Sequence, residues 1–323
     1  MAQRPETPPP TAGPLPPAPG SCRQTERASL AAILLLCLGT LAVYPWAAEQ
    51  GPAIPGLTAF FAGILLMGHG CVAWLVIALA RADGNPAILL LGLGYLASAF
   101  LAAPYMAVFP EALVPTGPLF GTSTSASWLF TGLNLATGLP SLAAALLVLS
   151  GPPPFRSRPA FDRLTALAIP ATLVAAALVT AIALRSDSWL PPLVSGDRFT
   201  PFYMMLNAVI IALHALAAFA MLALRGRIPV FAWAAVAHVA AALAHIGAAA
   251  GGMRFSIGWT YARISYTFAA LVVLIYFLTL FTRQQRALAA ANDLLEARVA
   301  ARTVELASAL SQRDTLLREV YHR

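Results

Sequence analysis

The last residues of the chain carry a histidine with a carboxylate one helical turn before it. Glu319 precedes His322 by three residues in the segment TLLREVYHR, residues 315–323. On a helix this spacing places both side chains on one face. A carboxylate can hold a neutral imidazole in one tautomer or accept its proton, which leaves a ring nitrogen to act as a nucleophile. This pair is therefore a candidate catalytic site, and the alternative is a histidine that is merely exposed.

Four further histidines lie inside long apolar segments, where ionisable groups are rare and often functional: His69, His214, His238 and His245. His238 and His245 are two helical turns apart, about 10.5 Å along the axis, which excludes both from one simple metal site. Each could instead pair with a histidine of another helix to bind a haem or metal ion. The favoured alternative is a neutral histidine bonded to a carbonyl or hydroxyl group, because no acidic or cysteine partner accompanies them.

The composition is that of an integral membrane protein. Of the 323 residues, 59% are hydrophobic and 10% are charged, whereas soluble proteins carry about 25% charged residues. All 20 cationic residues are arginine, and the net charge is +7. Because the arginines stand at the ends of apolar segments, the pattern indicates membrane topology and not a nucleic-acid-binding groove. The chain also has no CxxC, HExxH or glycine-rich phosphate loop, so no metal or nucleotide motif is evident.

Eight segments are long and apolar enough to cross a bilayer, which needs about 20 residues per helix. They are approximately 28–45, 57–80, 86–108, 126–150, 164–184, 202–224, 229–251 and 260–282. The predicted fold is an all-α, polytopic membrane bundle of eight transmembrane helices followed by a cytoplasmic coiled-coil helix. Four tryptophans near span ends have the positions of interfacial aromatic residues: Trp46, Trp128, Trp189 and Trp259.

The distribution of arginine predicts that both termini are cytoplasmic. With a cytoplasmic N-terminus, the outside set holds four arginines, namely Arg185, Arg198, Arg254 and Arg263. The inside set holds eleven, namely Arg4, Arg23, Arg27, Arg81, Arg156, Arg158, Arg163, Arg225, Arg227, Arg283 and Arg286. This excess satisfies the positive-inside rule. Arg263, near the outer end of the last span, is expected to snorkel or to pair with Glu111 or Asp197.

The composition also divides the chain along its length. Residues 1–27 contain the proline-rich stretch PPPTAGPLPPAPG and are expected to form a disordered cytoplasmic tail. Residues 28–282 form the eight-span domain. Residues 283–314 are polar and helix-favouring, and are expected to form a signalling stalk. Residues 315–323 complete the chain.

The stalk has a heptad pattern that favours a parallel coiled-coil dimer. The d positions are Leu288, Leu295, Arg302, Ala309 and Leu316, and the a positions are Asn292, Val299, Leu306, Arg313 and Val320. About seven of these ten can pack in a seam, and an asparagine at an a position sets the register. The two arginines weaken the seam or mark stutters. The alternative is a single solvated amphipathic helix.

The stalk resembles segments of bacterial sensor kinases. Residues 292–306, NDLLEARVAARTVEL, look like the signalling helix between a membrane domain and a catalytic core. Residues 312–323, QRDTLLREVYHR, are similar to the start of the phosphoacceptor box in the HWE-related class of histidine kinases. The family histidine maps onto His322, and Tyr321 stands where the family often has another histidine.

The membrane part resembles the fourth type of the membrane-associated sensor (MASE) domains of bacteria. The resemblance covers approximately residues 28–282 and is clearest over 94–128, GYLASAFLAAPYMAVFPEALVPTGPLFGTSTSASW. It implies a sensory input module in the bacterial inner membrane, ahead of a kinase or a cyclic-di-GMP enzyme. It does not define the stimulus. Because Arg263 and Tyr266 lie on the span that continues into the stalk, they are candidates for signal transmission, as is Asn292.

The resemblance to the kinases implies that His322 is the phosphoacceptor and Glu319 a helper carboxylate. It also implies a homodimer and a response regulator as partners. The kinase core is expected to be missing, with the chain truncated at the phosphoacceptor box, so this chain is expected to be inactive alone. ATP and magnesium are expected only with that core, and no cofactor is expected in this chain.

Two other functions remain open. One is a transporter or permease with a regulatory tail, although no span carries a central Asp, Glu or Arg and no two helices are clearly broken at matching depth. The other is a haem-binding or redox membrane protein that uses the intramembrane histidines.

Overall fold

A computed structural model of the chain describes residues 19–52, 54–110, 112–114, 117–151 and 157–322. The chain divides into two compact units, Met1–Leu274 and Ile275–Arg323.

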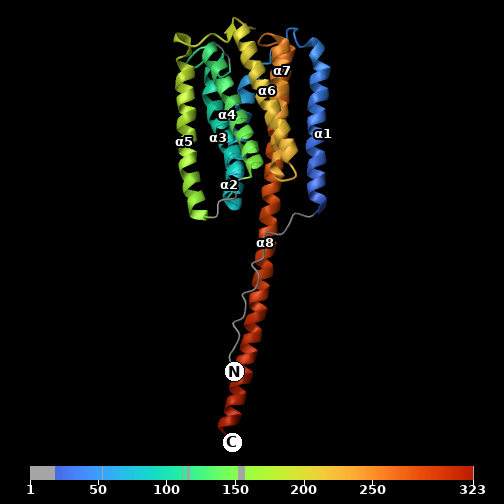
Figure 1. Cartoon of the computed structure of the whole chain (residues 1–323), viewed down its shortest axis with the longest axis vertical. Coiled ribbons are helices and arrows are strands. Elements are labelled where there is room, and N and C mark those ends of the chain that lie inside the picture. The colour runs from blue at the N-terminus through green and yellow to red at the C-terminus, as the bar shows by residue number, and fades with distance from the viewer. Residues whose placement is uncertain (1–18, 53, 111, 115–116, 152–156, 323) are drawn as a thin grey trace. The chain divides into compact units, whose positions relative to one another are not determined.

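The described part is almost entirely helical (Figure 1). Its long helices are α1 Pro19–Val43, α2 Leu57–Asp83, α3 Pro86–Val108, α4 Ser123–Ser150, α5 Arg158–Leu184, α6 Pro201–Leu224, α7 Val230–Gly251 and α8 Ile257–Tyr321. Two short 3-10 helices, η1 Tyr44–Trp46 and η2 Ser186–Ser188, follow α1 and α5. Strands β1 Val194–Ser195 and β2 Arg198–Phe199 pair antiparallel as a hairpin.

All eight long helices have the length and composition to cross a membrane, which confirms the predicted polytopic all-α bundle. The prediction for the N-terminal tail was partly wrong, because α1 begins at Pro19 and not after residue 27. Proline is favoured in the first turn of a helix, where its missing N–H is not needed. After Pro19, α1 contains no further proline and no run of glycines. The rest of the predicted tail, residues 1–18, lies outside the described residues.

Specific side chains fix where helices begin. The side chain of Asn85 accepts hydrogen bonds from the backbone N–H groups of Ala87 and Ile88 and so caps α3. Thr122 and Ser125 form a reciprocal capping box at the start of α4. These caps hold the ends of α3 and α4 in defined positions, and both helices carry residues of the cavity described below.

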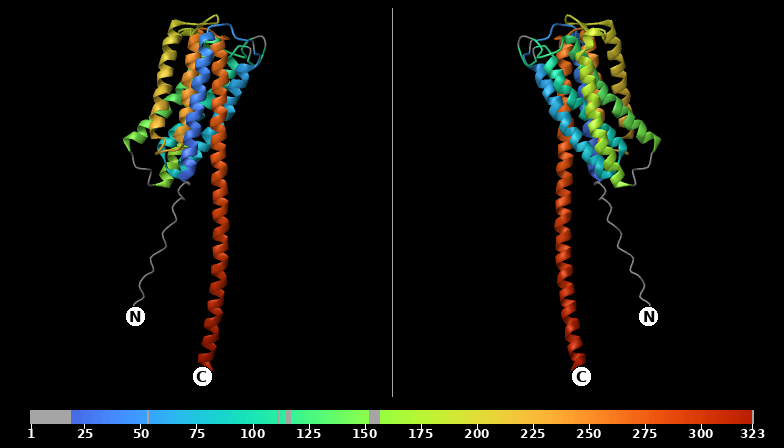
Figure 2. Two further views of the ribbon diagram at one scale, coloured as in Figure 1. Left: turned by 90° about the vertical axis from the view of Figure 1, so that its right-hand side faces the viewer. Right: turned by 90° about the vertical axis from the view of Figure 1, so that its left-hand side faces the viewer.

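In the first unit, α2, α3 and α4 pack side by side, α4 also packs on α6, and α7 packs between α6 and α1 (Figures 1 and 2). Helix α7 is the most enclosed, with 83% of its apolar window buried, whereas the corresponding share for α5 is 11%. A helix that is apolar all round but exposed is suited to contact with lipid. Helix α5 therefore lies at the periphery of the bundle.

The loops that follow α3, α5 and α7 lie at one end of the bundle, where α3 ends and α4, α6 and α8 begin. We call it the hairpin end because β1 and β2 lie there. The backbone N–H of Phe199 in β2 donates to the carbonyl of Gly252 at 3.0 Å, and that of Arg254 donates to the carbonyl of Asp197 at 2.7 Å. The hairpin is thereby fixed to the loop between α7 and α8.

The first turn of α8 is also tied to the loop after α1. The backbone N–H of Gly258 donates to the carbonyl of Ala47 at 3.0 Å, and that of Ile257 donates to the carbonyl of Glu49 at 2.9 Å. A side chain at Gly258 would collide with the carbonyl oxygen of Gly247 in α7. Glycine therefore permits the close approach of α7 and α8.

The second unit is a single helical segment, the part of α8 from Ile275 to Tyr321. Its surface carries local ion pairs between Arg302 and Glu305 at 2.8 Å and between Arg313 and Asp314 at 3.0 Å. Large apolar side chains at heptad positions are more than half exposed, namely Leu288, Leu295, Val299, Leu306, Leu316 and Val320. The predicted helix is confirmed, and its apolar seam has no covering in the single chain.

Candidate functional site

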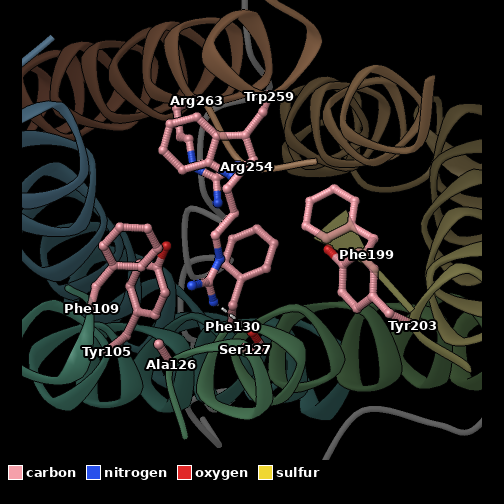
Figure 3. A pocket seen from close by; sticks show the side chains of 10 residues that line it. All are labelled: Tyr105, Phe109, Ala126, Ser127, Phe130, Phe199, Tyr203, Arg254, Trp259 and Arg263. Atoms are coloured by element: carbon pink, nitrogen blue, oxygen red, sulfur yellow. Dashed lines mark hydrogen bonds between the residues drawn. The ribbon is translucent and has the colours of Figure 1, made fainter. Parts of the chain in front are cut away.

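A cavity at the hairpin end is lined by side chains from α3, α4, β2, α6, the α7–α8 loop and α8 (Figure 3). The unfilled volume between them, including its open mouth, is about 290 Å³, and the centres of water-sized molecules can occupy about 20 Å³ of it. A single water needs roughly 10–15 Å³ by the second measure. The enclosed part of the cavity therefore has room for one or two water-sized groups.

Arg254 enters this cavity from the α7–α8 loop. Only 6% of the residue is exposed. Its Nη2 donates to the carbonyl of Ser123 at 3.0 Å and to Oγ of Ser127 at 2.8 Å, both near the start of α4. The guanidinium also lies 5.2 Å from the centroid of the Phe109 ring. These contacts hold the cation at the cavity wall (Figure 3).

Arg263 reaches the same cavity from α8. Its guanidinium carbon lies 3.7 Å from the centroid of the Trp259 ring and 5.2 Å from that of Phe130, distances at which a cation is attracted to the face of an aromatic ring. Only 6% of Arg263 is exposed, and its Nε has no hydrogen-bond partner among the described residues. The side chain therefore lies inside the bundle, so the expected snorkelling is not seen. Glu111, one expected partner, lies outside the described residues.

Carboxylates do not neutralise these two arginines in the described part of the chain. The ion pairs found there join Arg81 to Asp162, Arg302 to Glu305 and Arg313 to Asp314. The expected pairing of Arg263 with Asp197 is therefore absent. Burial lowers the pKa of Arg254. The positive charge of Arg263 lowers this pKa further, whereas Tyr105, Tyr203 and the carboxylate of Asp197 oppose the shift. Arginine stays protonated in proteins, so the wall of the cavity carries two cations.

The phenol of Tyr105 adds a third donor to the cavity wall. Tyr105 is 1% exposed, and its hydroxyl has no hydrogen-bond partner among the described residues. A buried hydroxyl without a partner is destabilising. Two guanidinium groups and a phenol thus offer N–H and O–H donors to the same small volume, an arrangement that complements a bound anion.

A family model described as a membrane-associated sensor, integral membrane domain matches residues 52–284. The chain belongs to this family, MASE4. The match includes α2 to α7 and the first part of α8, and it leaves α1 outside. No curated protein and no solved structure matches the chain. The membrane sensory role suggested by the resemblance of residues 28–282 is therefore shown, and the cavity of Arg254 and Arg263 lies within the matched segment.

The four intramembrane histidines of the MASE4 domain lie in three different hydrogen-bonded contacts. His69 Nδ1 lies 2.8 Å from Oγ of Ser98. His214 Nδ1 lies 2.8 Å from Nδ1 of His238. The imidazole of His245 bonds the side-chain oxygen of Asn207 in α6. No group of three or more His, Cys, Asp or Glu residues that could hold a metal ion occurs among the residues described.

The other predicted transmission residue of the MASE4 domain, Tyr266, lies one turn after Arg263. Tyr266 is 3% exposed, and its ring centroid lies 5.8 Å from that of Phe61 and 6.4 Å from that of His69. A second, smaller cavity is lined by both Arg263 and Tyr266, together with His245. The structure therefore brings two predicted transmission residues into contact with the core of the bundle.

The remaining predicted site residues lie in the second unit. Asn292, Glu319 and His322 are all exposed, and Arg323, the last residue of the terminal segment, lies outside the described residues. Glu319 and His322 have no hydrogen bond to each other in the structure, and the backbone N–H of His322 donates to the carbonyl of Arg318 at 3.1 Å. Glu319 and His322 are therefore related only by their three-residue spacing on the helix.

Sequence reasoning missed the role of Arg254, Tyr105 and Trp259 in the MASE4 cavity. Arg254 was interpreted only as a topological charge. Trp259 was expected at the membrane interface but is 2% exposed beneath Arg263. One signal was present: Trp259 and Arg263 are four residues apart, the spacing at which side chains meet on a helix.

Proposed function

We propose that this MASE4 domain is the sensory input module of a bacterial two-component histidine kinase. In this proposal a stimulus acts on the bundle, and α8 transmits the change to the kinase. The observation that carries the proposal is that one helix, Ile257–Tyr321, contains both Arg263 of the cavity and the heptad segment with Asn292. A continuous helix can couple a change at one point to another without a separate relay.

The link to a kinase is supported by the segment QRDTLLREVYHR at residues 312–323. His322 is exposed near the end of a helix, as a phosphoacceptor must be to meet a nucleotide. Phosphoryl transfer depends on positioning and on electrostatic stabilisation by several groups, so a kinase core with ATP and magnesium is required as a partner. Glu319 would orient or deprotonate the imidazole of His322, and a response regulator would receive the phosphoryl group.

A homodimer through the stalk is supported by the exposed heptad side chains of the second unit. Leucine and valine at successive a and d positions are more than half exposed in the single chain, and a parallel partner helix would bury them. Asn292 at an a position would fix the register of the two helices. Two registers or rotations of this pair would be the two states between which a stimulus selects.

The excess of arginine at one set of loops supports a location in the bacterial inner membrane with both termini in the cytoplasm. In this orientation the hairpin end, with Arg254 and Arg263, faces away from the cytoplasm. The cavity would then sample molecules of the periplasm or of the outer leaflet.

The test is a fusion of the full chain to a histidine kinase core, with autophosphorylation in membranes as the readout. Insertion of four residues after Arg286 rotates the helix that follows by roughly 40° relative to its original orientation, whereas insertion of seven restores the heptad register. We expect the first insertion to lock or abolish kinase output and the second to preserve regulation. Equal output from both insertions and the parent fusion would show that α8 does not transmit the signal.

A further inference from the structure

We infer that the cavity at the hairpin end is a binding site for a small monocarboxylate anion, held by Arg254, Arg263 and Tyr105. The inference identifies the stimulus of the proposed sensor, and it rests on the proposed function only for its effect on kinase output. Binding itself is a property of the bundle.

The first argument is the uncompensated charge. Arg254 and Arg263 are each 6% exposed, and the ion pairs of the described part involve neither of them. Removing a charge from water without a partner is strongly unfavourable. The ring faces of Trp259 and Phe130 offset only part of this for Arg263. An anion in the cavity would neutralise charges that no ion pair among the described residues compensates.

The second argument is the surplus of donors. Nε of Arg263 and the hydroxyl of Tyr105 are buried and have no hydrogen-bond partner among the described residues, and both residues line the cavity. A guanidinium is a donor and cannot accept. Only a species with acceptor atoms can satisfy these groups. A water molecule would supply an oxygen without charge, whereas a carboxylate provides two charged oxygens in the planar geometry that guanidinium groups recognise.

The third argument is the size and apolar character of the remaining wall. The enclosed part of the cavity, about 20 Å³, holds only one or two water-sized groups, so a carboxylate group would fill it and a short alkyl part would lie toward the open mouth. The rings of Phe109, Phe130 and Phe199 face the cavity (Figure 3). Aromatic walls would contact a short alkyl group while the oxygens meet the arginines. A carboxylate of two or three carbons meets both conditions, whereas a chloride ion has no apolar part and a phosphate would present a second charge and further oxygens to these rings.

The position of Arg263 would connect binding to output. Arg263 lies in the second turn of α8, and its neighbour Tyr266 packs against Phe61 of α2. An anion bound to Arg263 would compete with the ring of Trp259 for the guanidinium group. Since the ligand would favour the arrangement of α8 in which the guanidinium meets it, binding would shift the population of α8 conformations.

The test is a titration of the purified full chain in lipid nanodiscs with sodium acetate, followed by calorimetry and by thermal unfolding. Sodium chloride and sodium phosphate at the same ionic strength are the comparison salts. We expect acetate to bind saturably and to raise the unfolding temperature, with little effect of the other two salts. Equal effects of chloride or phosphate would overturn the assignment to a carboxylate.

Three variants make the test specific. Arg263→Met should raise the acetate Kd by on the order of tenfold or more, because a charge-assisted hydrogen bond is lost. Tyr105→Phe keeps the ring and should raise the Kd by roughly fivefold. Arg185→Met is the matched control, because Arg185 is an exposed arginine at the same end of the bundle. The Arg185→Met protein should bind acetate with an unchanged Kd. Unchanged acetate binding by both Arg263→Met and Tyr105→Phe would overturn the inference.

A kinase fusion separates this inference from the proposed function. Acetate binding that changes autophosphorylation supports both. Acetate binding without any effect on autophosphorylation supports the site and contradicts its role as the stimulus of a kinase. An absence of acetate binding overturns the inference and leaves the insertion experiment after Arg286 as an independent test of transmission.

Discussion

Nδ1 of His214 and Nδ1 of His238 lie 2.8 Å apart and join α6 to α7 within the bundle. Two nitrogens that ligate one tetrahedral metal ion at about 2.0–2.1 Å stand about 3.3 Å apart, so the observed contact is a hydrogen bond between rings. One imidazole must donate and the other must accept, which requires two different tautomers when both are neutral. The contact therefore fixes a relative arrangement of the two helices.

This pair leads to a double-mutant prediction. His214→Phe and His238→Phe should each destabilise the bundle, since each leaves a buried imidazole without its partner. The double variant should be more stable than the sum of the single losses predicts, by about 0.5–1.5 kcal/mol. Unfolding of all four proteins in detergent measures this coupling. His69→Phe is the control, because His69 pairs with Ser98. The losses of stability from His69→Phe and His214→Phe should add in the protein that carries both. Additive losses for His214→Phe and His238→Phe would contradict the hydrogen bond between these two rings.

An internal carboxylate should replace the anion in the cavity. Ser127 Oγ lies 2.8 Å from Nη2 of Arg254, so Ser127→Asp places a negative charge beside this cation. We expect the unfolding temperature to rise, with a gain of about 1 kcal/mol in the free energy of unfolding. We also expect acetate to lose its stabilising effect. Ser127→Ala is the matched control, which should lower stability and retain the acetate effect. A destabilised Ser127→Asp protein would argue against an uncompensated charge at Arg254.

The orientation of the bundle can be tested by chemical labelling. Ser195 at the hairpin end and Gly226 in the α6–α7 connection are both exposed, and a side chain at Gly226 would meet open space. In a variant without native cysteines, Ser195→Cys should react with a membrane-impermeant maleimide on intact spheroplasts. Gly226→Cys should react only after lysis. The reverse pattern would place the termini outside the cytoplasm.

Cysteine cross-linking tests the stalk dimer. Leu295 occupies a d position and Ala297 the f position of the same heptad, and both are exposed in the single chain. Oxidation in native membranes should cross-link Leu295→Cys efficiently and Ala297→Cys poorly, because only seam residues of a parallel pair face each other. Similar yields at the two positions would indicate a solvated single helix.

The eight spans could be predicted from the sequence because bilayer thickness sets a minimum apolar length, and this signal does not depend on which helices are neighbours. The same holds for the helical stalk, which lacks glycine and proline. The kinase link through His322 stays a prediction, because its chemistry requires groups outside the chain described. The length of each apolar segment was thus enough to predict the transmembrane helices and their number.

The cavity could not be predicted in this way. Arg263 was expected to snorkel because it stands near the end of a span, but Trp259 and Phe130 enclose it within the bundle. The contact of Arg263 with Phe130 of α4 depends on how α4 and α8 pack, and the periodicity of a single helix does not determine this packing. The pairing of His214 with His238 likewise depends on the rotation of α6 against α7. The sequence was therefore sufficient to predict the helices but not the side-chain contacts between them.

The unpaired arginines also have a consequence for the amount of protein in the cell. A ligand that binds only the folded state stabilises it by mass action. Without the anion, the two buried cations would lack an ion-pair partner among the described residues, and the protein would sample unfolded forms more often and be degraded faster by quality-control proteases. Receptor abundance would then rise with the concentration of the anion, so that cells which meet the ligand often would also become more sensitive to it.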